Sequence, residues 1–219
     1  MIAALRLFLS MGLVEVDMKI LNLYAGIGGN RKLWGDDHEI TSVEQYEPIA
    51  KIYAKLYPSD NLVIGCAHEY LLNHTDEFDF IWSSPPCQTH SKMMKATRHK
   101  TKRYSDMSLY QEILFLQNFY KGKWVVENVN PYYEPLIKGK LCGRHLIWSN
   151  FDIEPFDVPR PKGFINLANM KGKQSLMNWL GIHFDETVYY KGNHCPAQVL
   201  RNCVHPLLGA HIFNQMEQK

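Results

Sequence analysis

Short apolar runs alternate with polar stretches and with glycine- or proline-containing turns through the first half of the chain. Five of these runs have the length and composition of buried strands: 19–24, 40–43, 62–65, 78–82 and 123–126. Three stretches between them carry apolar residues at helical spacing: 48–57, 68–72 and 107–119. Strands and helices in regular alternation are typical of a mostly parallel sheet in an α/β fold.

A glycine-rich turn, Ala25-Gly26-Ile27-Gly28-Gly29-Asn30, follows the first predicted strand and leads into a predicted helix. Glycine lets the backbone approach a ligand closely, and a helix start presents free amide groups. The spacing differs from the dinucleotide-binding G-x-G-x-x-G, so the turn alone is equally compatible with an ordinary tight turn. Glu44 ends the second predicted strand, where α/β folds bind the hydroxyls of a ribose. Glu44 is therefore a candidate ribose ligand.

Two prolines, Pro85 and Pro86, end the fourth predicted strand and are followed directly by Cys87. This places a lone cysteine at the carboxyl edge of the sheet, where open α/β sheets bind ligands. Such a cysteine is either a small buried residue or a nucleophile. Glu127 follows the fifth predicted strand, so we expect a carboxylate in the same layer as Cys87.

Basic residues cluster after Cys87, with no acidic residue before Asp106. They are Lys92, Lys95, Arg98, Lys100, Lys102 and Arg103. A solvated surface loop and a loop that contacts phosphates are both compatible with this stretch. The formal net charge of the chain is only +2, so any nucleic-acid surface has to arise from such local clusters.

The alternating pattern lapses after residue 150, where several prolines and Gly163 indicate a loop-rich segment. Within the remainder of the chain, 175–180 has helical spacing, 187–190 has the pattern of a strand, and 199–214 reads as a turn followed by an apolar helix. The pattern divides the chain into an N-terminal extension, a sheet domain, a loop-rich segment and a C-terminal segment that returns to the sheet: 1–17, 18–150, 151–198 and 199–219.

The five cysteines are scattered, odd in number and without a C-x-x-C pair, which favours a reducing compartment over a disulfide framework. Cys142 with His145, or His194 with Cys195, could form half of a metal site, but no second half is visible and no metal is expected. The apolar residues at the N-terminus are too few for a membrane span and lack the features of a secretory signal. We expect a cytoplasmic protein that does not enter a membrane.

Four short motifs, in this order, resemble those of the DNA cytosine-5 methyltransferases. Leu23–Gly29 (LYAGIGG) is similar to the family's first motif, Pro86-Cys87-Gln88 to its nucleophile motif, and Glu127-Asn128-Val129 to its glutamate motif. Asn202-Cys203-Val204, with the proline and leucines that follow, is similar to its last motif. The resemblance covers roughly 19–150 and 199–214. It implies a Rossmann-like sheet that binds S-adenosylmethionine, with helices on both faces and 151–198 as a small target-recognition segment.

The resemblance also implies chemistry at carbon 5 of a cytosine in DNA. Cys87 would add to carbon 6 of the base, which makes carbon 5 able to attack the methyl group of S-adenosylmethionine. Glu127, kept partly protonated by burial, would protonate N3. Arg144, in a degenerate counterpart of the family's Q-x-R-x-R motif, would contact the cytosine carbonyl. A stacked base cannot reach Cys87, so the cytosine has to be flipped out of the duplex.

The implied cofactor-binding residues surround the glycine turn and the neighbouring strand ends: Tyr24, Ala25, Gly26, Ile27, Gly28, Gly29, Glu44, Gln45, Cys66, Ala67, Pro86 and Asn202. The residues implied for the nucleic acid lie around the two catalytic motifs and in the basic stretch: Ser84, Pro85, Gln88, Ser91, Lys100, Lys102, Arg103 and Asn128. The basic stretch would be the family's loop that closes on DNA.

Besides the degenerate Q-x-R-x-R motif, the chain departs from the family pattern at three further points. Cys66 stands where the family has an aspartate for the adenine amine, Arg201 replaces a glycine before the last motif, and the recognition segment is unusually small. The size is that of a compact member, such as a monomeric enzyme encoded by a phage, acting in a bacterium or an infected host with or without a partner restriction enzyme.

Three alternatives were weighed against DNA methylation. One branch of the family methylates tRNA, and the small recognition segment and near-neutral charge are compatible with RNA. The missing aspartate is compatible with a catalytically silent nucleic-acid-binding or regulatory protein, although Cys87 and Glu127 are present. Thymidylate-synthase-type enzymes also add a cysteine to carbon 6 of a pyrimidine, but the glycine turn and Glu44 do not suit their folate donor.

Overall fold

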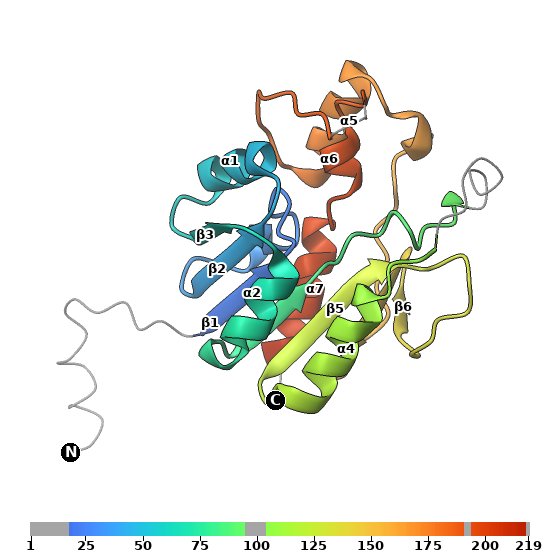
Figure 1. The fold of residues 1–219 in the computed structure, drawn as a ribbon. Coiled ribbons are helices and arrows are strands. Elements are labelled where there is room, and N and C mark those ends of the chain that lie inside the picture. The colour runs from blue at the N-terminus through green and yellow to red at the C-terminus, as the bar shows by residue number, and fades with distance from the viewer. Residues whose placement is uncertain (1–17, 95–103, 191–193, 218–219) are drawn as a thin grey trace, which may run out of the picture.

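A seven-stranded sheet forms the centre of the molecule. The computed structural model describes residues 18–94, 104–190 and 194–217, so the extension 1–17 and the basic residues Lys100, Lys102 and Arg103 lie outside the described part. The strands are β1 (Lys19–Leu23), β2 (Glu39–Glu44), β3 (Asn61–Ile64), β4 (Phe80–Ser83), β5 (Lys123–Val129), β6 (Lys140–Cys142) and β7 (His145–Ser149). Their order in the sheet is β3-β2-β1-β4-β5-β7-β6 (Figure 1).

The first five strands run parallel, and β7 pairs antiparallel with β5 and with β6. The order places β1 beside β4 at the centre, where the strand order reverses and where open α/β sheets bind ligands. The expected Rossmann-like α/β fold is thereby confirmed. Strands β6 and β7 were not expected from the sequence.

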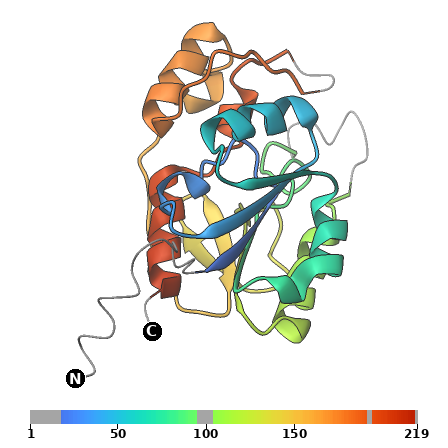
Figure 2. The same cartoon turned by 90° about the vertical axis from the view of Figure 1, so that its left-hand side faces the viewer.

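Helices cover both faces of the sheet because successive residues of each buried strand point to opposite sides. Leu21, Leu23 and Ile81 pack with α2 (Ala67–His74) and α4 (Ser108–Phe119) on one face. Ile20, Phe80 and Trp82 pack on the other face with α7 (Pro206–Glu217). Figure 2 shows the sheet between these two layers. Among the described residues, no helix has both the length and the apolar character needed to cross a membrane.

A third apolar cluster joins the loop-rich segment to the carboxyl edge of the sheet. It combines Ile27 and α1 (Glu47–Leu56) with η3 (Phe164–Asn166), α5 (Met170–Leu180) and α6 (Gln198–Arg201). Figure 2 shows α5 and α6 beyond the strand ends, close to α1. The segment therefore stands over the edge where the glycine turn and Cys87 emerge.

Two predicted elements are absent. The glycine turn leads only into a single 3-10 turn, η1 (Arg31–Leu33), so the predicted helix start with its free amides does not form. Gly35 and Asp36 follow too soon for a helix, and the Arg31 side chain is buried against them and Asp60. Residues 187–190 are not a strand, because they pair with no neighbouring strand.

The boundaries of other elements differ from the predictions in ways that matter for the site. Strand β5 continues to Val129, since β7 supplies an antiparallel partner, and Glu127 therefore lies inside a strand rather than after one. The helix predicted at 175–180 begins at Met170, where Asn169 caps it by accepting a hydrogen bond from Gly172 N. The predicted C-terminal helix is divided into α6 and α7.

Candidate active site

The glycine turn begins at a strained residue. Tyr24 has a φ of 56°, the only positive φ of a non-glycine residue in the described chain, and Gly26 and Gly28 follow with φ of 55° and 74°. The Tyr24 hydroxyl donates a 2.5 Å hydrogen bond to Glu112, a fully buried carboxylate on α4. Glu112 also accepts a hydrogen bond from Ser83 at the end of β4. It therefore ties the start of the glycine turn to the strand that precedes the cysteine loop.

Glu44 lies directly against the glycine turn. Its carboxylate accepts hydrogen bonds from Gly26 N at 3.0 Å and from Tyr46 N at 2.8 Å. Burial raises the pKa of Glu44, and these backbone N–H groups offset only part of that effect. A half-buried carboxylate at this edge can accept hydrogen bonds from the hydroxyl groups of a ligand.

The loop after β4 presents Cys87. The Asn128 side chain donates to the Pro85 carbonyl at 2.9 Å, and the amides of His90 and Ser91 both donate to the Cys87 carbonyl. Burial raises the pKa of the Cys87 thiol to about 11, and the nearby negative charge of Glu127 adds to the effect. Arg144 opposes it. The thiol is thus close to both predicted catalytic partners and is protonated at neutral pH.

Glu127 is buried and hydrogen-bonds through its carboxylate to His145 Nδ1. Burial alone would raise the pKa of Glu127, but His145, a hydrogen bond from Ser84 and the charge of Arg144 together hold it below its usual value. Burial is therefore outweighed by these contacts, contrary to the expectation that it keeps Glu127 partly protonated.

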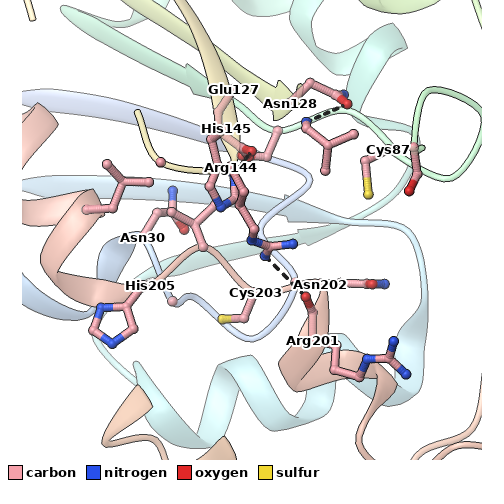
Figure 3. A pocket seen from close by; sticks show the side chains of 18 of the residues that line it. Asn30, Cys87, Glu127, Asn128, Arg144, His145, Arg201, Asn202, Cys203 and His205 are labelled. Atoms are coloured by element: carbon pink, nitrogen blue, oxygen red, sulfur yellow. Dashed lines mark hydrogen bonds and ion pairs between the residues drawn. The ribbon is translucent and has the colours of Figure 1, made fainter. Parts of the chain in front are cut away.

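Arg144 and Asn202 face the same space from opposite sides (Figure 3). Arg144 Nη2 donates to the Arg201 carbonyl at 3.3 Å, and its guanidinium lies over the Phe164 ring at 5.6 Å from the centroid. Burial lowers the pKa of Arg144. The side chains of Asn202 and Tyr190 hydrogen-bond to each other, and the Tyr190 ring stacks on Tyr46.

One large cavity of about 1390 Å³ connects these groups. Its walls include most of the residues singled out from the sequence: Tyr24, Ala25, Gly26, Ile27, Gly29, Glu44, Gln45, Ser84, Pro85, Pro86, Cys87, Gln88, Ser91, Glu127, Asn128, Arg144 and Asn202. The cavity therefore joins the glycine turn at the end of β1 to the cysteine loop, β5 and α6.

Three predicted cofactor residues do not line the cavity. Gly28 faces α1 and Tyr57, whose hydroxyl donates to the Gly28 carbonyl at 2.8 Å. Ala67 is buried in the apolar cluster under α2, and Cys66 precedes that helix. The basic residues predicted to contact nucleic acid lie outside the described residues, as stated above.

Residues 18–134, more than half of the chain, match the model of the family described as C-5 cytosine-specific DNA methylase. The chain belongs to this family. As a member of the C-5 cytosine methylases it is a methyltransferase, and its cofactor is S-adenosylmethionine, as expected from the motifs. A search of curated proteins found no match.

Solved structures similar to this methylase include a hypothetical protein of Thermus thermophilus, with a TM-score of 0.43, 14% identity, and coverage of 64% of this chain and 75% of that chain. A SAM-dependent methyltransferase from Agrobacterium tumefaciens has a TM-score of 0.40 and 14% identity. The match covers 55% of this chain and 42% of that chain. A DNMT2 mutant from Spodoptera frugiperda has a TM-score of 0.39 and 26% identity. The match covers 51% of this chain and 35% of that chain. The chain thus spans less than half of the last two.

The residues that line the cavity suit most parts of S-adenosylmethionine, with the adenine amine as the exception. A β-carbon placed on Gly26 would meet no atom within 4 Å, so the turn leaves open space beside the cavity. The Glu44 carboxylate is held next to this space and suits a ribose. Cys66 supplies no carboxylate for an adenine amine, and it lies away from the cavity wall.

Three residues at the site were missed by the sequence analysis: His145, Tyr190 and Glu112. His145 was set aside as an unrelated residue beside Cys142, yet it bonds Glu127. Tyr190 comes from the loop-rich segment and Glu112 from a helix with no motif. The unusual polarity of Glu112 inside an apolar helical pattern was the one available signal.

Proposed function

We propose that this methylase transfers a methyl group to carbon 5 of cytosine in DNA through a covalent bond between Cys87 and carbon 6 of a flipped-out base. The observation that supports this most directly is the convergence of Cys87, Glu127 and Arg144 on one cavity that also contains the glycine turn. Membership of the C-5 cytosine methylases supports the choice of base and atom.

Each group has a distinct task in this proposal. The Cys87 thiolate attacks carbon 6, and Glu127 gives N3 of the ring a proton or a strong hydrogen bond. Arg144 donates a hydrogen bond to the cytosine carbonyl. S-adenosylmethionine, when bound, supplies the electrophilic methyl group. Asn202 and Glu44 hold the two ends of the cofactor, and the buried position of the site excludes water from the reacting atoms.

Base flipping follows from the burial of the site. The Cys87 thiol lies within the cavity and the Glu127 side chain is almost fully buried, so a stacked base in a duplex cannot reach either group. The cavity is large enough for a nucleoside besides the cofactor, since ligand sites usually have volumes of about 300–1,000 Å³.

Transfer of a labelled methyl group from S-adenosylmethionine to duplex DNA and to tRNA tests the proposal. We expect the wild-type protein to label DNA and the Cys87→Ser variant to label none. Cys87→Ser should still bind the cofactor normally, because the proposal assigns the thiol to the base and the glycine turn to the cofactor. Labelling of tRNA alone would assign the activity to RNA. Near-normal turnover by Cys87→Ser would remove Cys87 from its role, and no transfer to either substrate would favour a silent nucleic-acid-binding protein.

A further inference from the structure

A histidine is built into the same sheet face as the glutamate of the site. In the antiparallel pair of β5 and β7, Val129 lies opposite His145 and Glu127 lies opposite Ile147. Residues two apart on a strand share a face, as do directly opposed residues, so His145 and Glu127 are diagonal neighbours on one face. Their side chains hydrogen-bond through Nδ1 and the carboxylate.

Both members of this pair are almost fully buried, with exposed fractions of 7% for His145 and 6% for Glu127, and both line the cavity that holds Cys87. The charged and titratable groups that face the pair come from three elements: Arg144 before β7, Cys87 in the loop after β4 and Cys203 after α6. Ser84 adds a neutral hydrogen bond.

Glu127 by itself is a poor proton donor, since these contacts hold its pKa below the usual value. Cytosine N3 nevertheless has to gain a proton, or a strong hydrogen bond, for the addition at carbon 6 to proceed. Histidine exchanges a proton readily between about pH 5 and 8, so it can release one and recover it in each turnover. Of the groups that contact Glu127, His145 is the one suited to this exchange.

We propose that His145 supplies, through Glu127, the proton that cytosine N3 takes up when Cys87 adds to carbon 6. This inference rests on the proposed function. The thiol proton leaves to solvent before the step. Glu127 first takes the Nδ1 proton of His145, which is left neutral. The sulfur electron pair then forms the bond to carbon 6, the C5=C6 pair becomes a C4=C5 bond, and the C4=N3 pair takes the proton that Glu127 has received. The reverse transfer occurs when the sulfur is eliminated.

The pH dependence of addition separates this role from a structural one. The pKa of Cys87 is raised to about 11, so the thiolate fraction grows about tenfold per pH unit throughout the neutral range. In the wild-type protein we expect the rate to rise with pH and then to level off, because a histidine donor loses its proton as the pH rises and this loss cancels the gain in thiolate. Without His145 the rate should continue to climb towards pH 11.

The experiment is single-turnover formation of the covalent adduct with a 5-fluorocytosine duplex and S-adenosylmethionine, between about pH 5.5 and 9.5. We compare the wild type with His145→Gln, Glu127→Gln and His183→Gln, an exposed histidine as the matched control. Both site variants should be slower by about two to four orders of magnitude at pH 6 and should lose the plateau. His183→Gln should retain the wild-type profile, and thermal unfolding checks that every variant is folded.

The possible outcomes separate the two proposals. If the wild type forms the adduct and folded His145→Gln keeps the same plateau at a lower level, His145 only positions Glu127 and the proton route is refuted. The same conclusion follows if Glu127→Gln retains the plateau. If the wild type forms no adduct at any pH, the proposed function itself fails. A climbing profile in both variants supports the route.

Discussion

Tyr24 illustrates how one strained residue shapes the site. A left-handed conformation of a non-glycine residue costs about 1–2 kcal/mol, and the surrounding structure has to compensate for it. Here the compensation comes from Glu112, which accepts hydrogen bonds from Tyr24 at 2.5 Å, Ser83 at 2.7 Å and His68 at 3.0 Å. The buried carboxylate thus holds together the ends of β1 and β4, from which the glycine turn and the cysteine loop emerge.

Glu112→Ala is expected to lower the free energy of unfolding by about 2–4 kcal/mol, because it leaves the buried hydroxyl of Ser83 and the hydroxyl of half-buried Tyr24 without their partner. Urea denaturation measures the change, with Gln111→Ala on the exposed side of α4 as the control. Tyr24→Phe, which removes one of the hydrogen bonds, should cost less than Glu112→Ala. Equal stability of Glu112→Ala and the control would show that the three contacts contribute nothing net.

At the scale of elements, the stretch 186–190 closes one side of the cavity by running alongside α1. The Tyr46 hydroxyl donates to the Tyr189 carbonyl at 3.0 Å, and Lys55 forms an ion pair with Glu186. Tyr190 consequently lies between the two predicted ends of the cofactor site. Burial and the charge of Glu44 raise the pKa of the Tyr190 hydroxyl, and the Asn202 side chain hydrogen-bonds to that hydroxyl. A segment outside the sheet domain thereby contributes a wall to the cofactor cavity.

Tyr190→Ala is expected to weaken binding of S-adenosylmethionine by about tenfold, which corresponds to about 1.4 kcal/mol. The reason is the loss of an aromatic wall and of one contact of Asn202, whose Oδ1 still accepts a hydrogen bond from Gln198. Calorimetric titration with the cofactor measures it, and Tyr189→Ala is the matched control because the Tyr189 side chain is exposed and only its backbone contacts Tyr46. Tighter binding by Tyr190→Ala would mean that the ring competes with the cofactor for space.

At the scale of the whole molecule, the proposed methylation of DNA would require the loop-rich segment to supply most of the sequence readout, since the proposed catalytic site occupies the sheet domain. The residue types of this segment that suit base contacts are Arg160, Lys162, Asn166, Asn169, Lys171, Lys173, Gln174 and Asn178. The fold reduces this set. Lys173 is buried and donates to the carbonyls of Asp185 and Glu186, and Asn169 caps α5. Arg160 and Asn166 line the cavity and remain the best placed.

With so few side chains available, we expect a short or relaxed target of about two to four base pairs around the flipped cytosine. Bisulfite sequencing of a plasmid methylated in vitro maps the target. Arg160→Ala should broaden it, whereas Lys171→Ala on the exposed side of α5 should leave it unchanged. A strict target of six or more pairs would contradict this expectation and would require a partner protein or another readout surface.

The sequence alone indicated the parallel part of the sheet, its order along the chain and the residues at its carboxyl edge. Those features depend on local apolar runs and on turns, and the four motifs lie at such turns. Predictions failed where the partner of a residue is distant in sequence. Glycine residues after β1 suggested a helix start, yet the buried side chain of Arg31, its contacts with Gly35 and Asp60, and the packing of α7 produce a single 3-10 turn.

The sequence by itself therefore determined the family, the cofactor and the alignment of Cys87 with Glu127 at one edge, because parallel strands bring their carboxyl ends together. Only the tertiary structure decided the contacts that lower the pKa of Glu127 and the composition of the cavity. His145 reaches Glu127 through an antiparallel return of β7, and Tyr190 reaches Asn202 through packing on α1. Neither contact has a local pattern, since both depend on hydrogen bonds and apolar packing between segments far apart along the chain.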